Sequence, residues 1–505
     1  IHIFFTAAIS EVVTDDIHNV VTDGIHNVFL KRYSEWCANY LTVIFKKSLI
    51  SATVPQLWKL ANVVPVFKSG NKQLIPNYRP ISLLSTSSKL LEHIIHKYIV
   101  EYLNAHNILS RSQHGFRACY STVTQLLEFT HDVASSLNDR GQIDAIFIDY
   151  SKAFDLVCHA KLLVKLRTFF GDNKLVDWIA DYLRSRTQFV TFNHVKSSEV
   201  QITSGVPQGS VLGPLLFIIY INDVAEIIGD TQIKLRMYAD DCVIYNTISS
   251  VEDQEALNSV FSLFCNWSEN WQMSINFKKT VAMTFSNKKQ PLSFAYTNNG
   301  VSLARVTEFK YLGVTLTTNL KWRTHVETIC NKALRKLWYL RRTLNNSTKE
   351  CKLTAYKTLV RPILEYASVV WSPHHKHDIA MLESVQKKAI RFIFRRYDQR
   401  FSPTSHAHVL SLQSLEHRRT CDRIILLHKT VHTGLGVLAP ISFVAASARR
   451  TRRFDPLNIT PFRASLDCFK FSFFPWTVDL WNELDGSLRR LDALQFEKEL
   501  RSHVF

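Results

Sequence analysis

The sequence predicts a mixed α+β fold up to about residue 317 and a region built almost wholly of helices after it. In the first part, short runs rich in β-branched and aromatic residues alternate with helical patterns. From Trp322 onward, W-R-T-H-V-E-T-I-C-N-K-A-L-R-K-L-W-Y-L sets an apolar stripe beside a basic face, as in an amphipathic helix. With 46% hydrophobic residues, the 505-residue chain can bury several domain-sized cores.

The expected elements follow in order along the chain. Apolar residues recur at helical spacing from residue 41 until Pro55 interrupts them, and A-N-V-V-P-V-F then reads as a short strand. We therefore expect four regions: a connector at 1–48, a mixed region at 49–317, a helical region at 318–400, and a C-terminal helical region at 401–505 whose fold the sequence does not define. Further strands are expected at 145–148, 189–192, 234–238, 242–245 and 281–285.

The charge of the chain indicates a polyanionic partner. Lys and Arg exceed Asp and Glu by 18, and the pI is near 9.4, so nucleic acid is the expected partner. A membrane is not expected, because the longest apolar run, residues 211–221, is much shorter than the ~20 residues of a spanning helix. The nine cysteines form no C-x-x-C pair, which indicates neither a zinc site nor a disulfide framework and favours a reducing intracellular compartment.

Basic residues concentrate in the helical region. Between Lys321 and Arg361 there are eleven Lys or Arg against two acids. Further basic clusters follow at 386–396, where aromatics interleave with cations, and at 449–453, where R-R-T-R-R is expected to form an exposed loop. We expect Trp322 and Trp338 to pack in the core rather than to serve as stacking platforms.

Two acidic features suggest a cation site. In Y-A-D-D at 238–241, two adjacent acids lie between two strand-like runs, so they are expected at a hairpin tip. Asp149 ends the apolar run A-I-F-I-D. Acids at turns and strand ends also occur for conformational reasons alone. However, two Mg²⁺ ions about 4 Å apart need hard oxygen ligands converging from separate elements, which this combination supplies.

A glycine-rich segment lies between these acids. S-G-V-P-Q-G-S-V-L-G-P at 204–214 has three glycines and two prolines, and an apolar helix follows it. Alone it is a loop that enters a buried helix. Such a loop also allows a backbone to approach a base pair closely, with Gln208 available for contact.

In their order, these motifs resemble those of reverse transcriptases. F-I-D-Y-S-K-A-F-D, S-G-V-P-Q-G-S-V-L-G-P, Y-A-D-D, I-N-F-K-K-T and F-K-Y-L-G-V are similar to motifs A to E of that family. Upstream, V-V-P-V-F-K-S-G and N-Y-R-P-I-S-L-L-S are similar to the fingers motifs of its non-LTR (LINE-type, jockey-like) retrotransposon branch. The resemblance runs from about residue 22 to about residue 400.

The resemblance implies a right-hand polymerase that copies RNA into DNA. Fingers and palm would occupy 49–317 and a helical thumb 318–400, with an antiparallel palm sheet covered by helices on one side. It assigns Mg²⁺ (two ions, or Mn²⁺ in their place) to Asp149, Asp240 and Asp241. Asp144 and Asp155 have no such match. Lys279 falls on the lysine that protonates the leaving pyrophosphate, although neighbouring Lys278 leaves this register open by one residue.

The resemblance also implies substrate contacts. Phe154 falls on the steric gate that excludes a 2′-hydroxyl, and Tyr150 is expected to line the same pocket. The hairpin residues Tyr311, Leu312 and Gly313 would grip the primer, and the basic helices would follow the duplex through its phosphates. The other expected dNTP contacts are Lys68, Arg79, Gln208 and Gly209. The nucleic-acid contacts expected in the helical region are Lys321, Arg335, Lys336, Arg341 and Arg342.

Two other readings of the motifs remain open at this point. One is a group II intron maturase-like protein, and the other is a decayed transposon fragment that retains only RNA binding. The expected partners are an RNA template, a DNA primer and dNTPs, in the nucleus or in a cytoplasmic ribonucleoprotein. Because the chain starts at Ile1, we read it as a fragment, with an element-encoded endonuclease expected upstream or in a missing N-terminal part.

Overall fold

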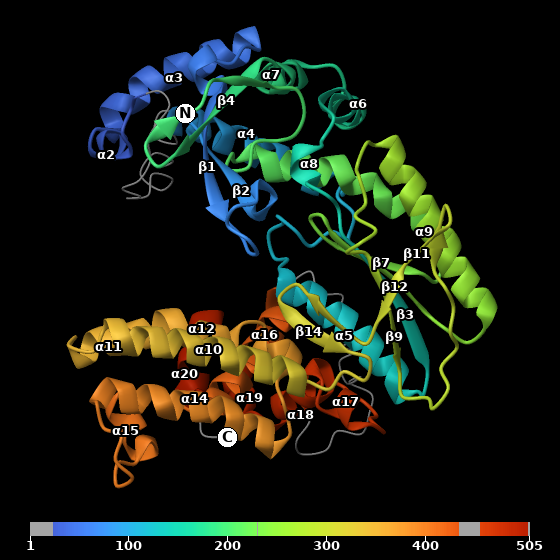
Figure 1. The fold of residues 1–505 in the computed structure, drawn as a ribbon, viewed down its shortest axis with the longest axis vertical. Coiled ribbons are helices and arrows are strands. Elements are labelled where there is room, and N and C mark those ends of the chain that lie inside the picture. The colour runs from blue at the N-terminus through green and yellow to red at the C-terminus, as the bar shows by residue number, and fades with distance from the viewer. Residues whose placement is uncertain (1–23, 230, 434–454, 503–505) are drawn as a thin grey trace.

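The structure, a computed structural model, describes residues 24–229, 231–433 and 455–502. The R-R-T-R-R cluster at 449–453 lies outside these residues. In Figure 1 an upper lobe and a lower helical lobe face each other on the left, and a central sheet joins them on the right. The α+β fold expected up to residue 317 and the helices expected after it are both observed.

The upper lobe is built around a small sheet. Strand β1 (Leu60–Phe67) pairs antiparallel with β2 (Tyr78–Leu83) and parallel with β4 (Arg186–Phe192). Short strands β5 (Val195–Lys196) and β6 (Val200–Ile202) each pair antiparallel with β4. The helices of this lobe are α2 (Asn27–Arg32), α3 (Ser34–Ser51), α4 (Thr86–Ala105), α6 (His159–Phe170), α7 (Lys174–Leu183) and α8 (Leu212–Ile221).

The central sheet has the strand order β12-β9-β3-β8-β7. Its pairs are antiparallel except for β12 with β9, which run parallel. All six strands expected from the sequence are present, four of them in this sheet. Its strands are β3 (Gln142–Ile148), β7 (Lys234–Tyr238), β8 (Asp241–Thr247), β9 (Val281–Ser286) and β12 (Ala304–Val306), and the two hairpins beside it are β10 (Thr297–Asn298) with β11 (Val301–Ser302) and β13 (Glu308–Tyr311) with β14 (Val314–Thr317).

Helices cover both faces of this sheet, so the expectation of helices on one side was wrong. Helix α5 (Thr122–Asn138) lies on one face, where Phe129 packs against Phe147 of β3. Helix α9 (Val251–Asn270) lies on the other, in the core that holds Ile146 and Ile148. All seven residues of β3 are buried. A strand covered on both faces reads as a continuous apolar run, and the run A-I-F-I already had that form.

The lower lobe forms one core with the sheet face under α5. Helix α10 packs against α12 and α14, α16 packs against α14, α18 and α20, and α17 and α18 reach back to α5. Residues 401–502, as far as they are described, therefore add helices to the same core. The helices are α10 (Arg323–Thr343), α11 (Lys349–Ala355), α12 (Arg361–Glu365), α13 (Ser368–Trp371), α14 (Lys376–Phe394), α15 (Pro403–Val409), α16 (Leu415–Thr433), α17 (Asp467–Lys470), α18 (Phe473–Glu483), α19 (Gly486–Arg489) and α20 (Ala493–Ser502).

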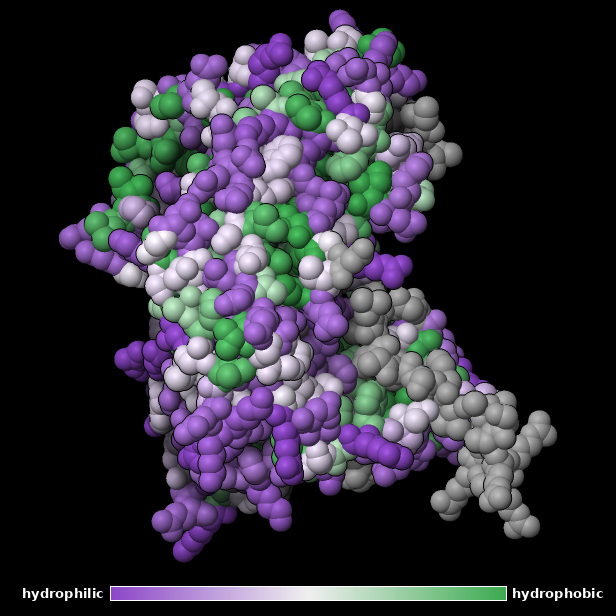
Figure 2. Space-filling view, turned by 90° about the vertical axis from the view of Figure 1, so that its right-hand side faces the viewer, coloured by the Kyte–Doolittle hydropathy of each residue, from purple (hydrophilic) through white to green (hydrophobic). Residues whose placement is uncertain are grey.

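Polar side chains dominate the face of the molecule that Figure 2 shows. On the face seen in Figure 2, apolar side chains gather only in scattered patches among polar ones. Within the described ranges, no helix is both long enough and apolar enough to span a bilayer.

Candidate active site

The structure brings the three predicted acids to one edge of the central sheet. Asp149 follows the last residue of β3, and β3 pairs with β8 in a register that sets Ile148 opposite Cys242. The next residue of each strand is therefore Asp149 on one side and Asp241 on the other. Strands β7 and β8 are joined by a two-residue turn of Ala239 and Asp240. The expected hairpin tip is thus present, with Asp149 beside it.

The surroundings of Asp240 and Asp241 raise the pKa of both carboxyl groups. Loss of water contact, followed by repulsion from Asp149, raises the pKa of Asp240. Asp241 keeps more than a third of its surface exposed, but the surrounding protein displaces much of the water near its carboxylate. That desolvation, with repulsion from Asp240 and Asp149, raises the pKa of Asp241 to about 6. A bound cation would relieve this repulsion.

The donor chemistry fits Mg²⁺, but the carboxylates do not form a preassembled group. Three carboxylates supply the hard oxygen ligands that Mg²⁺ prefers. Within the described part of the chain, however, no three acidic, histidine or cysteine side chains lie close enough together to hold a metal ion. Instead, Nζ of Lys279 lies 3.7 Å from Oδ2 of Asp149. This contact identifies Lys279 as the lysine that reaches the acids.

Two cations of the upper lobe reach the same acids. Lys68 follows β1, and Arg79 lies on β2 opposite Val66. The positive charges of Lys68 and Arg79 both lower the pKa of Asp240, against the larger effect of desolvation. Both side chains are exposed. The structure therefore brings these two predicted phosphate-binding residues within electrostatic reach of the acidic turn.

The glycine-rich loop packs against β2. Gly209 has φ of 124°, and a Cβ there would lie 2.4 Å from the carbonyl oxygen of Ser82, so only glycine fits without strain. The Ser82 N–H donates to the carbonyl oxygen of Gln208 at 2.7 Å. Nε2 of Gln208 donates to Oδ1 of Asp155 at 2.9 Å. Asp155, which had no motif match, thus orients Gln208.

The two aromatic residues after Asp149 lie in different places. Phe154 is half-buried and stacks on Phe217 of α8, with ring centroids 4.2 Å apart and planes 15° apart. Tyr150 is buried instead, and its hydroxyl shares a 2.8 Å hydrogen bond with Ser268 of α9. The Tyr150 hydroxyl therefore points into the core, and the expected place of Tyr150 beside the nucleotide stays a prediction.

The predicted primer-grip residues form a tight hairpin turn. Tyr311 pairs with Val314, and Leu312 and Gly313 between them have φ of 44° and 85°. Tyr366 of the lower lobe fixes this turn, because its hydroxyl donates to the Leu312 carbonyl at 3.0 Å. The turn and the acids Asp149 and Asp241 line one pocket of about 250 Å³. Tyr311 itself is buried and anchors the hairpin from within.

The sequence interpretation missed Gln113, which holds the acidic turn. This residue is fully buried, and its Oε1 accepts hydrogen bonds from the N–H groups of Ala239 at 2.9 Å and Gly115 at 2.7 Å. The segment around it forms a bridge with Met237 of β7. Ala239 has φ of 55°, a conformation that costs energy for a residue with a Cβ. Gly115 packs against the same turn, because a Cβ on it would lie 2.4 Å from the Ala239 nitrogen. These contacts join residues far apart in the sequence, so the local sequence pattern did not reveal them.

The basic residues of α10 divide into separate groups. Arg335, Arg341 and Arg342 line one surface hollow of about 800 Å³ together with Trp338 and Asn345. Lys336 lies outside this hollow, beside Tyr339. Lys321 precedes the helix and lines a different cavity with His374 and His375.

Of the two tryptophans expected in the core, only one packs there. Trp322 is half-buried against the core of the lower lobe. The expectation for Trp338 was wrong, because 47% of its surface is exposed. Its neighbours Leu337 and Leu340 fill the buried stripe of the helix and leave Trp338 on the outer face.

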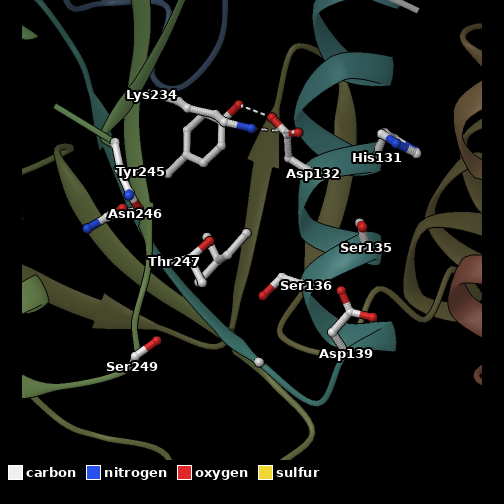
Figure 3. A pocket seen from close by; sticks show the side chains of 13 residues that line it. His131, Asp132, Ser135, Ser136, Asp139, Lys234, Tyr245, Asn246, Thr247 and Ser249 are labelled. Atoms are coloured by element: carbon white, nitrogen blue, oxygen red, sulfur yellow. Dashed lines mark hydrogen bonds and ion pairs between the residues drawn. The ribbon is translucent and has the colours of Figure 1, made fainter. Parts of the chain in front are cut away.

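A second polar pocket lies far from the acids. About 440 Å³ of space separates α5 from the far ends of β7 and β8, and two of its charged groups, Asp132 and Lys234, pair with each other (Figure 3). Asp132 receives a 2.6 Å hydrogen bond from the Tyr245 hydroxyl and lies 2.8 Å from Nζ of Lys234. Thr247 of this pocket is six residues from Asp241, about 20 Å along an extended strand. This pocket is thus not part of the acidic site.

Comparison with known proteins shows which proteins this chain resembles. Residues 68–316 match the family model described as reverse transcriptase (RNA-dependent DNA polymerase). The chain is 30% identical over 365 residues to a probable RNA-directed DNA polymerase from transposon BS of Drosophila melanogaster, which covers 70% of this chain. It is 29% identical to the corresponding polymerases from the X-element and from mobile element jockey of the same organism, over 72% and 70% of this chain.

The chain spans 40% to 41% of the length of these three relatives. Among solved structures, apo telomerase from Candida tropicalis aligns over 80% of this chain and 68% of its own, with 12% identity and a TM-score of 0.41. The family match covers the acids, strands β2 and β4, and the β13–β14 hairpin up to residue 316, and the transposon relatives extend it over most of the chain. The chain therefore belongs to the reverse transcriptases of non-LTR retrotransposons.

Proposed function

We propose that this chain is an RNA-directed DNA polymerase that extends a DNA primer on an RNA template. The observation that carries the proposal is the meeting of Asp149, Asp240 and Asp241 at one sheet edge within reach of Lys68 and Arg79. Acids that hold metal and cations that hold a triphosphate are the two charge patterns that phosphoryl transfer needs. In this proposal the upper lobe and sheet act as fingers and palm, and the helices from α10 act as the thumb.

The three acids would hold two Mg²⁺ ions. When bound, the ions supply positive charge that lowers the pKa of the primer hydroxyl and neutralises the departing pyrophosphate. Lys279 would exchange its contact with Asp149 for one with the leaving group. Desolvation and, after it, repulsion among the carboxylates raise the pKa values of Asp240 and Asp241, which gives the free site a reason to take up cations.

The nucleotide would lie between the fingers strands and the acids. Lys68 and Arg79 bind its triphosphate, Arg79 through a bidentate fork. Phe154, backed by Phe217, packs beneath the sugar, where an added 2′-hydroxyl would collide with the ring. Gln208, oriented by Asp155, and Gly209, held against Ser82, shape the loop that the base pair approaches.

The reaction forms one P–O bond and breaks another. The 3′-hydroxyl of the primer gives up its proton to water and its oxygen attacks the α-phosphorus. The bond to the bridging oxygen breaks, and pyrophosphate leaves with a proton from Lys279. The Leu312–Gly313 turn holds the primer end in the pocket beside Asp149 and Asp241. Arg335, Lys336, Arg341 and Arg342 of α10 bind phosphates of the template and primer, which fixes position without reading sequence.

The cellular setting is part of the proposal. The protein would work inside the cell, bound to its RNA as a ribonucleoprotein in the nucleus or the cytoplasm. An endonuclease encoded by the same element would supply the primer end. The transposon origin of the relatives favours this reading over a group II intron maturase.

Primer extension tests the proposal. Purified protein is mixed with a DNA primer annealed to a long RNA template, dNTPs and Mg²⁺, and products are resolved by length. We expect stepwise extension that EDTA abolishes and that ribonucleotides do not support. Folded protein that binds the primed template yet adds no nucleotide would contradict the proposed function.

A further inference from the structure

The outer end of helix α10 carries an exposed aromatic and cationic surface. Trp338 is 47% exposed, and Tyr397, just after α14, is 49% exposed. The Arg341 guanidinium lies between them, with Cζ 5.3 Å from the Trp338 ring centroid and 4.2 Å from the Tyr397 ring centroid. We call these three residues, with Arg335 and Arg342, the thumb-end surface.

An exposed tryptophan at this place calls for an explanation. Leaving a large apolar ring in water forgoes burial energy, and neighbouring positions of α10 do point into the core. Helix-dipole stabilisation accounts for Arg341 and Arg342 in the last turn. It gives no reason for an exposed indole beside them.

The charge around the ring is positive and uncompensated along the helix. No acid occurs between Lys332 and Lys349, a stretch that contains Arg335, Lys336, Arg341 and Arg342. The hollow there measures about 800 Å³, within the size range of ligand sites. An anionic partner with flat aromatic groups fits such a surface. Single-stranded nucleic acid has both properties, because every base offers a π-face and every linkage a negative charge.

We propose that the thumb-end surface binds an unpaired stretch of RNA by stacking a base on Trp338 while its arginines contact the flanking phosphates. This inference rests on the proposed function, under which the RNA bound at the thumb-end surface is the template. A duplex does not fit equally well, since its bases are already stacked and its phosphates alone reach the protein. Trp338 lies 15 residues after the start of α10, or about 22 Å along the helix from the palm end. The contact would therefore hold template outside the region being copied.

Binding of short oligonucleotides separates stacking from charge. Affinity for a labelled 12-nucleotide RNA, and for a blunt RNA–DNA hybrid of the same length, is measured by anisotropy in EDTA without dNTPs. Trp338→Ala should weaken binding of the single strand about 5- to 150-fold, the range found for loss of one base-stacking ring. Trp338→Phe, which keeps a ring, should retain most of the affinity. Binding of the hybrid should change less than twofold.

The controls decide between this site and a general effect. Tyr98→Ala removes an aromatic side chain that is 65% exposed on α4, and it should leave RNA binding unchanged. Equal losses on single strand and hybrid, or unchanged single-strand binding by Trp338→Ala, would overturn the proposal. Because no catalysis is measured, the result is independent of the proposed polymerase activity.

Discussion

The ammonium group of Lys279 lies 3.7 Å from Oδ2 of Asp149, whereas no such ion pair joins the neighbouring Lys278 to an acid in the described residues. Lys279 belongs to the turn before β9, where its N–H donates to the carbonyl of Asn276. The N–H of Asp149 in turn donates to the Thr280 hydroxyl oxygen at 3.2 Å, so the two elements are fixed relative to each other.

Lys279→Met should lower kcat for primer extension about 100-fold, because a general acid contributes a factor of that order to proton transfer. Lys278→Met is the matched control, since it removes the same charge one residue earlier. Its kcat should stay near that of the parent. Equal rate losses in the two variants would contradict the assignment of the proton donor to Lys279.

Gln113→Met should impair the acidic turn. Methionine fills a similar volume but leaves the buried N–H groups of Ala239 and Gly115 without their acceptor, at about 1–3 kcal/mol each. We expect lower kcat and a higher Mg²⁺ requirement, with KM for dNTP little changed. Gln113→Glu keeps an accepting oxygen and should recover most of the Mg²⁺ affinity. A variant that is merely less stable, with normal Mg²⁺ dependence in its folded fraction, would contradict a positioning role.

Asp241→Asn should stabilise the metal-free protein at neutral pH. The folded pKa of about 6 lies above the ordinary 3.8, so the folded state binds more protons than the unfolded state between these values. Stability is therefore lost as the pH rises through that window. At pH 7 in EDTA, the free energy of unfolding of the variant should be about 1 kcal/mol larger than that of the parent, after allowance for solvent screening. Thermal melts that show no gain at pH 7, or the same gain near pH 3, would contradict this.

Phe154→Val should relax the choice of sugar. The smaller side chain opens space where a 2′-hydroxyl would meet the ring, while Phe217 still supports the site from α8. The ratio of kcat/KM for dNTP to kcat/KM for rNTP measures this choice, and it should fall by about 10-fold or more. An unchanged ratio would show that another residue excludes ribonucleotides.

Sequence order predicted most of the acidic site but not its supports. Asp149, Asp240 and Asp241 could be singled out because acids at a strand end and in a turn are visible in the local sequence, and the structure brings these elements side by side. Gln113 was missed because its function depends on a contact with Ala239, 126 residues away. The position of Tyr150 depends similarly on Ser268.

The helical patterns also had limits. The apolar stripe of α10 was correct, yet hydrophobic character alone placed Trp338 in the core, whereas the 3.6-residue period sets Leu337 and Leu340 there and turns Trp338 outward. The helices of residues 401–502 were expected, but their packing on α5 depends on long-range contacts such as Ser465 with Asn138.

The most direct test of the central claim is primer extension by Asp240→Asn. The substitution keeps the shape of the side chain and removes the charge of a carboxyl group whose pKa is raised. Because the folded state does not favour that charge, the circular dichroism spectrum should show an intact fold. Asp172→Asn, at a side chain that is 89% exposed, is the matched control and should extend like the parent. We expect Mg²⁺-dependent extension by Asp240→Asn to fall by about 100-fold or more. Extension near the parent rate by folded Asp240→Asn would contradict the assignment of this acidic turn as the catalytic centre.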